Sequence, residues 1–399
     1  MAGTARGTDR FGIMAVLAST AILTSACTGA ASPSPSSTGA PASASAPAPS
    51  SSGPAASISG VDIAKQRIAD YTTKPTGIPI TEQLAQRPTG KTFVFVQCGV
   101  PECAAHARNL QEAAPILGVT IKIIPAGNTA ASTQGAFASA AQLKPAAVLE
   151  AAIPAALWPN QLKELQDQGT PVVAWAIPED AGNGLSVVFN GTPRFEATGK
   201  RMADYVIAQS NGNAHVVFFF PPEYAVFVSE ANGFKQEVGE LCPTCTVEIV
   251  EAPANTIGST MPGRIVSYIQ QKPSTNYVAL AFGSMNIGVP QAMAAAGLAD
   301  KVSTISQAGG QVNFGFLKDK QQTADLANDL HVEAWMGLDI AARLATGQQV
   351  AQSEGSPSSS TPQVFVTQDN VASQTVDSDG WWIAFPDYVD TFKKLWGVQ

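Results

Sequence analysis

Four short apolar segments decide the fold: TFVFVQ (92–97), TIKIIP (120–125), AAVLE (146–150) and PVVAWA (171–176). Nearly continuous apolar runs of this length are typical of parallel strands that are buried on both faces of a sheet. Amphipathic stretches between them predict helices at 102–117, 132–143 and 160–168. The alternation of strands and helices therefore predicts a doubly wound α/β lobe.

The same alternation repeats after residues 186–190. Because 399 residues exceed one ordinary core, two doubly wound parallel-sheet lobes of similar size are expected. Two such lobes form a cleft at the carboxyl ends of their strands, where open α/β sheets bind ligands. The second cycle consists of predicted helices at 196–210, 228–240, 263–271 and 287–296 and predicted strands at 215–220, 246–251, 277–282 and 302–306.

Composition excludes several classes of function. A net charge of −8 argues against a protein that binds nucleic acid through a basic face. Three histidines leave little material for a metal site, and no cofactor is expected. None of the nucleophile-elbow, zinc-protease, phosphate-loop or dinucleotide motifs is present. Glycoside hydrolysis needs two facing carboxylates, and Glu102 with Glu230 is the only candidate pair. Because no catalytic motif supports it, we expect the protein not to be an enzyme.

The first 90 residues predict export and a spacer. Arg6 and Arg10 precede an apolar run at 11–23 that is too short to cross a bilayer, which indicates a secretory signal peptide at 1–26. Residues 28–57 contain only Ala, Ser, Pro, Thr and Gly, a composition that predicts a disordered tether over 27–57. A lead-in helix at 58–71 and an extended segment to residue 90 follow.

Export places the remaining cysteines in an oxidising compartment, where close spacing favours disulfides. Cys98 and Cys103 bracket a short loop, and Cys242 and Cys245 bracket a turn. A zinc site made from both pairs and a thioredoxin-like role for the CxxC are the alternatives. No histidine accompanies either pair at ligand spacing, so disulfides are favoured, with their connectivity left open.

The residues LTSAC (23–27) resemble a bacterial lipobox, although Thr24 stands where that pattern prefers Leu. The resemblance implies that Cys27 becomes the lipidated N-terminus. Several acyl chains on one residue suffice for stable membrane attachment. The alternative is ordinary cleavage nearby, which would leave Cys27 as a free thiol.

Five short motifs then resemble, in order and spacing, the type I periplasmic binding proteins of the ribose-binding group, whose lobes are shared with lactose-repressor-like regulators. They are PVV (171–173), GF (233–234), IG (287–288), EAWMGLD (333–339) and VTQDNV (366–371), and the likeness covers 91–396.

The resemblance implies two lobes joined by three crossovers, near 190–193, 308–311 and 353–360. Lobe 1 would comprise 91–190 plus 311–347, including a strand at 323–327 and a helix at 332–344. Lobe 2 would comprise 191–310 plus 348–399, ending in a strand at 363–367 and a terminal helix within 385–396.

Fold and compartment together predict the function. Lactose-type repressors carry a basic helix-turn-helix where this chain has a signal and a neutral tether, so a transcription factor is excluded. We expect a monomeric solute receptor outside the cytoplasm, attached to the bacterial cell membrane through lipid only, that delivers its ligand to an ABC permease. The alternative is a module that presents its liganded form to a membrane sensor, and neighbouring genes would separate the two.

Sugar binders of this family surround the ligand with acids and an arginine. The aligned positions here are Phe282, Gly283, Ala176, Glu230 and Ala308, so these charges are missing or reversed. No Arg or Lys stands at the aligned strand ends, which argues against an anionic ligand. The expected ligand contacts are Gln97, Glu102, Trp158, Trp175, Asn190, Tyr224, Glu230, Ser284, Asn286, Gln307 and Trp335.

This set of side chains could stack on and hydrogen-bond a sugar or polyol, the default ligand of the family. It could equally hold a less polar or cationic solute against aromatic faces. Glu230 is expected to be the one buried charge on the ligand. Core packing is the alternative role for the three tryptophans, and a first-turn position favoured by the helix dipole is the alternative for Glu102.

Overall fold

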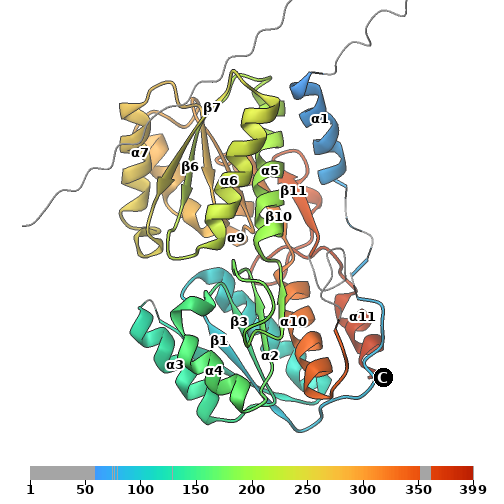
Figure 1. The fold of residues 1–399 in the computed structure, drawn as a ribbon. Helices are drawn as coiled ribbons and strands as arrows, with labels where there is room; N and C mark the ends of the chain where they lie inside the picture. Colours follow the sequence, from blue (N-terminus) through green and yellow to red (C-terminus); the bar gives the residue numbers. More distant parts are fainter. Residues whose placement is uncertain are drawn as a thin grey trace, which may run out of the picture. The chain divides into compact units, whose positions relative to one another are not determined.

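Two separate sheets organise the computed structural model, which describes residues 59–73, 75, 77–78, 80–127, 129–350 and 361–398. The described residues belong to one compact unit, Ser57–Gln399. Each sheet is the centre of one lobe of that unit (Figure 1). The expected signal peptide at 1–26, the lipidation site Cys27, the tether at 27–57 and the third crossover at 353–360 lie outside the described residues.

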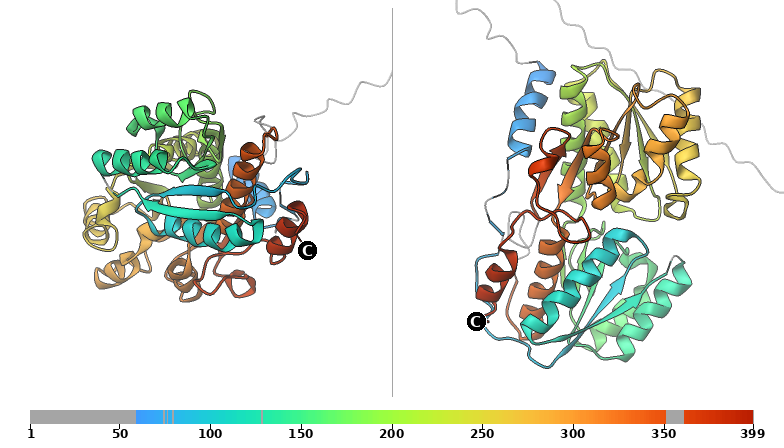
Figure 2. Two further views of the ribbon diagram at one scale, coloured as in Figure 1. Left: turned by 90° about the horizontal axis from the view of Figure 1, so that it is seen from below. Right: turned by 180° about the vertical axis from the view of Figure 1, so that it is seen from behind.

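Lobe 1 contains five parallel strands in the order β2 (Thr120–Pro125), β1 (Thr92–Gln97), β3 (Ala147–Ala151), β4 (Val172–Trp175) and β5 (Val187–Phe189). Its helices are α2 (Pro101–Leu117), α3 (Ala130–Gln142), α4 (Pro159–Asp167) and α10 (Leu330–Ala345), with a single turn at Ala155–Leu157. Helices α3 and α4 cover one face of the sheet, and α2 and α10 cover the other (Figures 1 and 2). Coverage on both faces explains why every residue of β3 and β4 is buried and why all of them except Glu150 are apolar.

Lobe 2 contains six strands in the order β11 (Gln363–Thr367), β10 (Ala324–Asn328), β9 (Ser303–Gln307), β8 (Tyr277–Leu280), β6 (His215–Phe220) and β7 (Thr246–Glu251). All neighbours are parallel except β10 and β11. Its helices are α5 (Thr192–Gln209), α6 (Val226–Leu241), α7 (Met261–Gln271), α8 (Val289–Ala295) and α9 (Gln311–Lys318), with single turns at Ala254–Thr256 and Gly283–Asn286. The doubly wound α/β fold expected from the sequence is therefore present in both lobes.

Helices α5 and α6 approach each other unusually closely at two glycines. A Cβ atom on Gly199 would lie 1.9 Å from the carbonyl oxygen of Glu230, and one on Gly233 would lie 2.2 Å from that of Glu196. Only glycine permits this backbone approach. The contact sets the position of the first turns of both helices, which face lobe 1.

The second passage between the lobes differs from the expectation. The strand expected to return to lobe 1 is β10, which pairs with β9 in the sheet of lobe 2. The residues after the expected crossover at 308–311 form α9, also in lobe 2. The chain leaves lobe 2 only after Asn328, and α10 then packs on α2 and β3. The apolar pattern of residues 323–327 predicts a buried strand but does not indicate which sheet the strand joins, because its pairing partners are distant in sequence.

The terminal helix α11 (Tyr388–Leu395) was expected on lobe 2 and packs instead on lobe 1. Trp396 stacks on Trp335 of α10 with ring centroids 5.3 Å apart, and its indole N–H donates to the Asp339 carboxylate at 2.9 Å. The outward face of α10 is aromatic, so it needs a cover, and the end of the chain provides it. Residues after β11 therefore cross back to lobe 1.

The N-terminal segment also touches both lobes. Helix α1 (Gly60–Tyr71) packs on α5 of lobe 2, where Arg67 forms ion pairs with Asp204 and Glu237. Further along, Leu84 is buried in the core of lobe 1, and its N–H donates to the carbonyl of Leu395 at 2.8 Å. This segment is drawn in blue at the side of both lobes in Figures 1 and 2.

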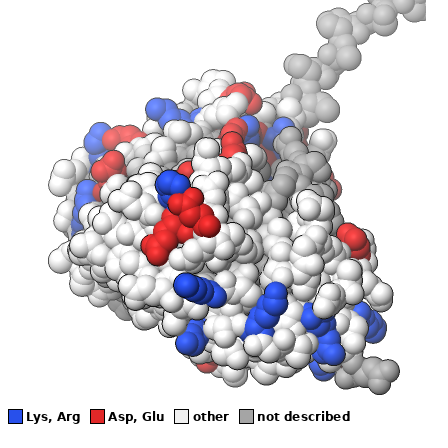
Figure 3. Space-filling model, turned by 60° about the horizontal axis from the view of Figure 1, so that its bottom comes forward, with Lys and Arg blue, Asp and Glu red and all other residues white. Residues whose placement is uncertain are grey.

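The part of the chain that the structure describes contains two disulfides: Cys98–Cys103 closes the turn between β1 and α2, and Cys242–Cys245 closes the turn after α6. Across the described ranges, no helix combines the length and apolar character that crossing a bilayer requires. The face drawn in Figure 3 is mostly uncharged and carries both acidic and basic side chains.

Candidate functional site

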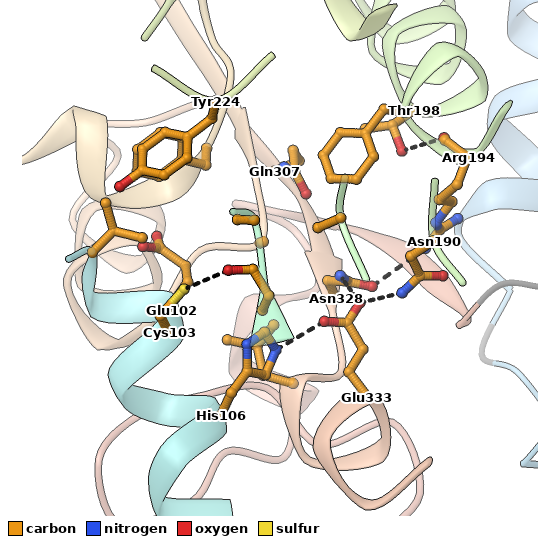
Figure 4. A pocket seen from close by; sticks show the side chains of 18 of the residues that line it. Glu102, Cys103, His106, Asn190, Arg194, Thr198, Tyr224, Gln307, Asn328 and Glu333 are labelled. Atoms are coloured by element: carbon orange, nitrogen blue, oxygen red, sulfur yellow. Dashed lines mark hydrogen bonds and ion pairs between the residues drawn. The ribbon is translucent and has the colours of Figure 1, made fainter. Parts of the chain in front are cut away.

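A pocket lies between the two lobes, where the carboxyl ends of their strands meet (Figure 4). The space between its walls, including the part open to solvent, is about 650 Å³. Helix α2 and the ends of β3 and β4 form the wall from lobe 1. The first turns of α5 and α6 and the ends of β8 and β9 form the wall from lobe 2. Its lining is Val100, Glu102, Cys103, His106, Ala151, Ala152, Ala176, Asn190, Arg194, Phe195, Thr198, Tyr224, Phe227, Phe282, Gln307, Ala308, Asn328, Leu330, Glu333 and Gln363.

The wall from lobe 2 contains a cluster of aromatic side chains. Phe227 stacks on Phe282 with centroids 5.2 Å apart, and the Tyr224 ring meets both of them edge-on. Ala176 and Ala308 stand at strand ends with positive φ angles of 56° and 51°. Their small side chains leave room for a solute where bulkier residues would fill the pocket. The part of the pocket beside the aromatic rings is therefore suited to the apolar face of a ring-shaped solute.

The floor of the pocket is a hydrogen-bond network around Glu333 of α10. One carboxylate oxygen accepts hydrogen bonds from the amides of Asn190, at 2.7 Å, and Asn328 and from the hydroxyl of Thr361, at 3.0 Å. The other oxygen is 2.9 Å from Nε2 of His106 on α2. Asn190 and Asn328 stand at the first two passages between the lobes, and Thr361 precedes β11. Glu333 thus ties together the segments about which the lobes would rotate.

Glu102 joins the lobes at the opposite side of the pocket. It lies in the first turn of α2, and its carboxylate accepts hydrogen bonds from the Ser284 N–H at 3.2 Å and hydroxyl at 3.1 Å. Burial raises the pKa of Glu102 to about 7, because removal from water disfavours its charged form. Burial likewise raises the pKa of Tyr224 to about 12, with a smaller contribution from the nearby Glu102 carboxylate.

Arg194 supplies a positive charge that the sequence analysis missed. Helix α5 was expected to begin at residue 196 but begins at Thr192, which places Arg194 in its first turn, facing the pocket. The guanidinium donates to the Asn328 side-chain oxygen at 3.3 Å. Burial, and next the charge of Arg201, lower the pKa of Arg194 to about 9. The sequence contains a signal for this helix start, because proline is common in the first turn of a helix and Pro193 stands there.

A family model described as "Periplasmic binding protein domain" matches residues 104–349. The chain belongs to the periplasmic binding protein family. This confirms the resemblance read from the sequence and, because the family binds solutes and is not enzymatic, the expectation that the chain is not an enzyme. No curated protein sequence matches the chain.

Solved structures of binding proteins share the fold at low identity. An ABC sugar transporter subunit from Rhodobacter sphaeroides has a TM-score of 0.61 at 19% identity, covering 71% of this chain and 99% of its own. A 5-methylthioribose transporter solute-binding protein from Thermotoga lettingae has a TM-score of 0.66 at 14% identity, covering 79% and 99%. An ABC transporter solute-binding protein from Bacillus halodurans with bound myo-inositol has a TM-score of 0.63 at 14% identity, covering 72% and 98%.

Of the contacts expected from the sequence, the binding protein brings Glu102, Asn190, Tyr224 and Gln307 together in the interlobe pocket. Gln307 also donates to the Ala281 carbonyl at 2.9 Å. Ser284 lies next to the pocket through its hydrogen bonds to Glu102.

The other expected contacts lie away from the pocket lining. Trp158 stacks on Phe137 in the core of lobe 1, Trp335 is covered by Trp396, and Trp175 stacks between Phe95 and Phe189. These three tryptophans have the core role that was the alternative. Large aromatic side chains pack wherever a sheet meets a helix, so residue type alone does not separate the two roles.

The remaining polar candidates are also outside the lining. Gln97 ends β1 on the side of β2, and Asn286 donates to Gln322 inside lobe 2. Glu230 is fully buried on α6, and neither of its carboxylate oxygens has a hydrogen-bond partner among the described residues. Burial raises its pKa far above the usual range. Because Glu230 does not line the pocket, it does not face Glu102 as a hydrolytic pair would require.

Sequence reasoning also missed His106, Phe227 and Glu333. Glu333 is the first residue of the motif EAWMGLD, yet Trp335 was selected from it. Phe227 lies in the first turn of α6, three residues after Tyr224 in the preceding turn. His106 lies four residues after Glu102 on α2 and could have been found from that spacing, which places both on one helix face. Within the described ranges, no group of three or more His, Cys, Asp or Glu residues could hold a metal ion.

Proposed function

We propose that this chain is the solute-binding subunit of an ABC importer, held outside the cytoplasm by a lipid on Cys27. The observation that carries the proposal is the pocket whose walls come from both lobes. A solute in this position contacts both lobes at once, so it stabilises their closed arrangement. A monomer on a tether would present that closed form to the permease at a raised effective concentration.

The chemistry of the pocket favours a small uncharged solute with one apolar face and several hydroxyl groups. The rings of Tyr224, Phe227 and Phe282 offer a stacking surface for the apolar face. Arg194 and Gln307 offer hydrogen-bond donors and an acceptor for hydroxyls. Arg194 also offsets nearby carboxylate charge, which removes the need for a cationic ligand.

The ligands of two structural neighbours belong to this class. One of them has bound myo-inositol, and another is in complex with 5-methylthioribose, a sugar with an apolar substituent. A sugar or polyol of this kind is therefore the first choice for a binding test.

The test is a thermal-shift screen of the full chain against sugars, polyols, amines and small aromatic compounds. A ligand at about 100 times its Kd adds about 2.7 kcal/mol to the free energy of unfolding. Calorimetry of the best ligand would then compare wild type with Phe227→Ala, which should bind about tenfold more weakly because a stacking face is lost.

Val228→Ala is the matched control, because Val228 is the next residue on α6 and is exposed. It should bind like wild type. Absence of a hit in all four classes would contradict a solute-binding role. An unchanged Kd in Phe227→Ala would contradict the interlobe pocket as the site.

A further inference from the structure

A second hollow lies where α1, α5 and the start of β11 meet. Its wall includes Asp70 and Tyr71 of α1, Arg194 and Arg201 of α5, and Gln363 at the start of β11. Arg194 and Gln363 line the interlobe pocket as well, so the two spaces share a wall. Arg201 lines the second hollow only.

The two arginines in this wall form no direct ion pair with a described residue, although the charges of Glu333 and Glu230 act on Arg194 from nearby. Arg194 is 8% exposed and donates one hydrogen bond, to Asn328. Arg201 donates to the side-chain oxygen of Gln363 at 2.9 Å and lies 5.2 Å from the centroid of the Tyr71 ring. Among the residues that the structure describes, neither guanidinium forms an ion pair.

Three other arginines form ion pairs: Arg67 with Asp204, Arg108 with Asp379 and Arg343 with Asp339. Two more arginines of the described chain form none, but both are exposed to water. Arg194 is therefore the one buried arginine among the described residues that has no ion pair. A guanidinium has five donors, and those of Arg194 and Arg201 are mostly unused by the described residues.

It is unfavourable to place two like charges without an ion pair next to each other, one buried on Arg194 and one half-buried on Arg201. Arg194 and Arg201 lie close enough to repel each other, and the pKa of each is lowered mainly by burial. A bound anion would reverse both effects, because it would pair with both guanidinium groups and supply acceptors to their free donors.

We propose that this hollow binds a small oxyanion, a phosphate, sulfate or carboxylate group, between Arg194 and Arg201. The exposed carboxylate of Asp70, which also lines the hollow, opposes such binding and limits its affinity. The hollow shares Arg194 and Gln363 with the solute pocket, but Asp70 and Arg201 line the hollow only, so variants of these two residues test the anion site apart from the function proposed above.

Calorimetric titration of the full chain with inorganic phosphate, sulfate or acetate tests the site, with ionic strength held constant by chloride. Saturable binding of at least one of these anions is expected, and the preferred anion identifies the class. Phosphate and sulfate also stabilise proteins without binding, through exclusion from the surface, so a thermal shift alone is not sufficient.

Two substitutions of opposite expected sign test the residues. Arg201→Gln should weaken binding at least about tenfold, because a charged, forked donor is lost. Asp70→Asn should strengthen binding about threefold, because a repelling charge is removed from an exposed position that tolerates substitution. Asp300→Asn, at an exposed residue far along the chain, is the control and should bind like wild type.

The proposal is overturned if none of the three anions gives a saturable signal above chloride. It is also overturned if Arg201→Gln and Asp70→Asn, both folded by circular dichroism, bind the preferred anion as wild type does.

Discussion

Glu102 of lobe 1 and Ser284 of lobe 2 form a two-point hydrogen bond across the interlobe boundary, with both carboxylate oxygens engaged. The bond closes one side of the pocket, and the Glu333 network closes the floor. Opening of the lobes would return the Glu102 carboxyl to water, where its pKa would fall toward its usual range. Closure is therefore linked to the protonation of Glu102.

We predict that Glu102→Gln removes a pH dependence of stability. The pKa of Glu102 is about 7 in the closed structure against 4.5 for the free side chain, so the folded form binds the proton more tightly. Stability should be greatest below pH 4.5 and fall as pH rises to about 7, by up to about 3 kcal/mol from this residue. Urea unfolding at several pH values would measure the slope for wild type and variant.

The control for this prediction is Glu164→Gln, at an exposed residue of α4. It should keep the wild-type slope, to which other buried acids with raised pKa values, such as Asp325, also contribute. An equal slope in Glu102→Gln and wild type would show that the Glu102 carboxyl does not titrate with closure.

Removal of the Glu333 carboxylate should destabilise the protein strongly. In Glu333→Ala, the amides of Asn190 and Asn328 lose a buried charged acceptor, and His106 loses its partner. A loss of about 3 kcal/mol or more is expected in urea unfolding. Glu333→Gln should lose less, because its amide oxygen still accepts. Equal stability of Glu333→Ala and the exposed variant Glu164→Ala would refute the role of Glu333 in joining the passages.

We predict opposite effects on stability for glycine-to-alanine substitutions at two helical positions, Gly199 and Gly239. Gly199→Ala places a methyl group 1.9 Å from the Glu230 carbonyl, so α5 and α6 must separate, and we expect a loss of several kcal/mol. Gly239→Ala on α6 has no neighbouring atom within 4 Å and should be neutral or stabilise by about 0.5–1 kcal/mol. Thermal unfolding of both variants provides the comparison. Similar values for the two would contradict the close helix approach.

The C-terminal cover of α10 should be a structural element with no direct solute contact. Trp396→Ala removes a buried ring that stacks on Trp335 and a hydrogen bond to Asp339, so we expect a loss of about 3–5 kcal/mol. Leu157→Ala, at an exposed position, should change stability by less than about 0.5 kcal/mol. If Trp396→Ala weakened the binding of an identified solute without loss of stability, the role assigned to this ring would be wrong.

Local pattern was sufficient for most elements and for part of the site. The strands near residues 92, 120 and 172 and the helix at 102–117 were predicted from apolar periodicity, because burial on both faces leaves a continuous apolar run. Glu102, Asn190, Tyr224 and Gln307 were predicted because strand ends and first turns meet at one edge of a doubly wound sheet. Arg194 was missed because the start of α5 was placed four residues late.

By itself, the sequence determined the alternation of strands and helices, the two-lobed α/β class and the family, since these depend on local periodicity and on motifs in a fixed order. Only the tertiary structure decided that β10 pairs in lobe 2, that Trp396 covers Trp335, and that Glu333 rather than Trp335 faces the pocket. Each of these outcomes depends on contacts between segments far apart in the chain. Such contacts are selected by the shape and hydrogen bonding of the whole fold, which no local pattern records.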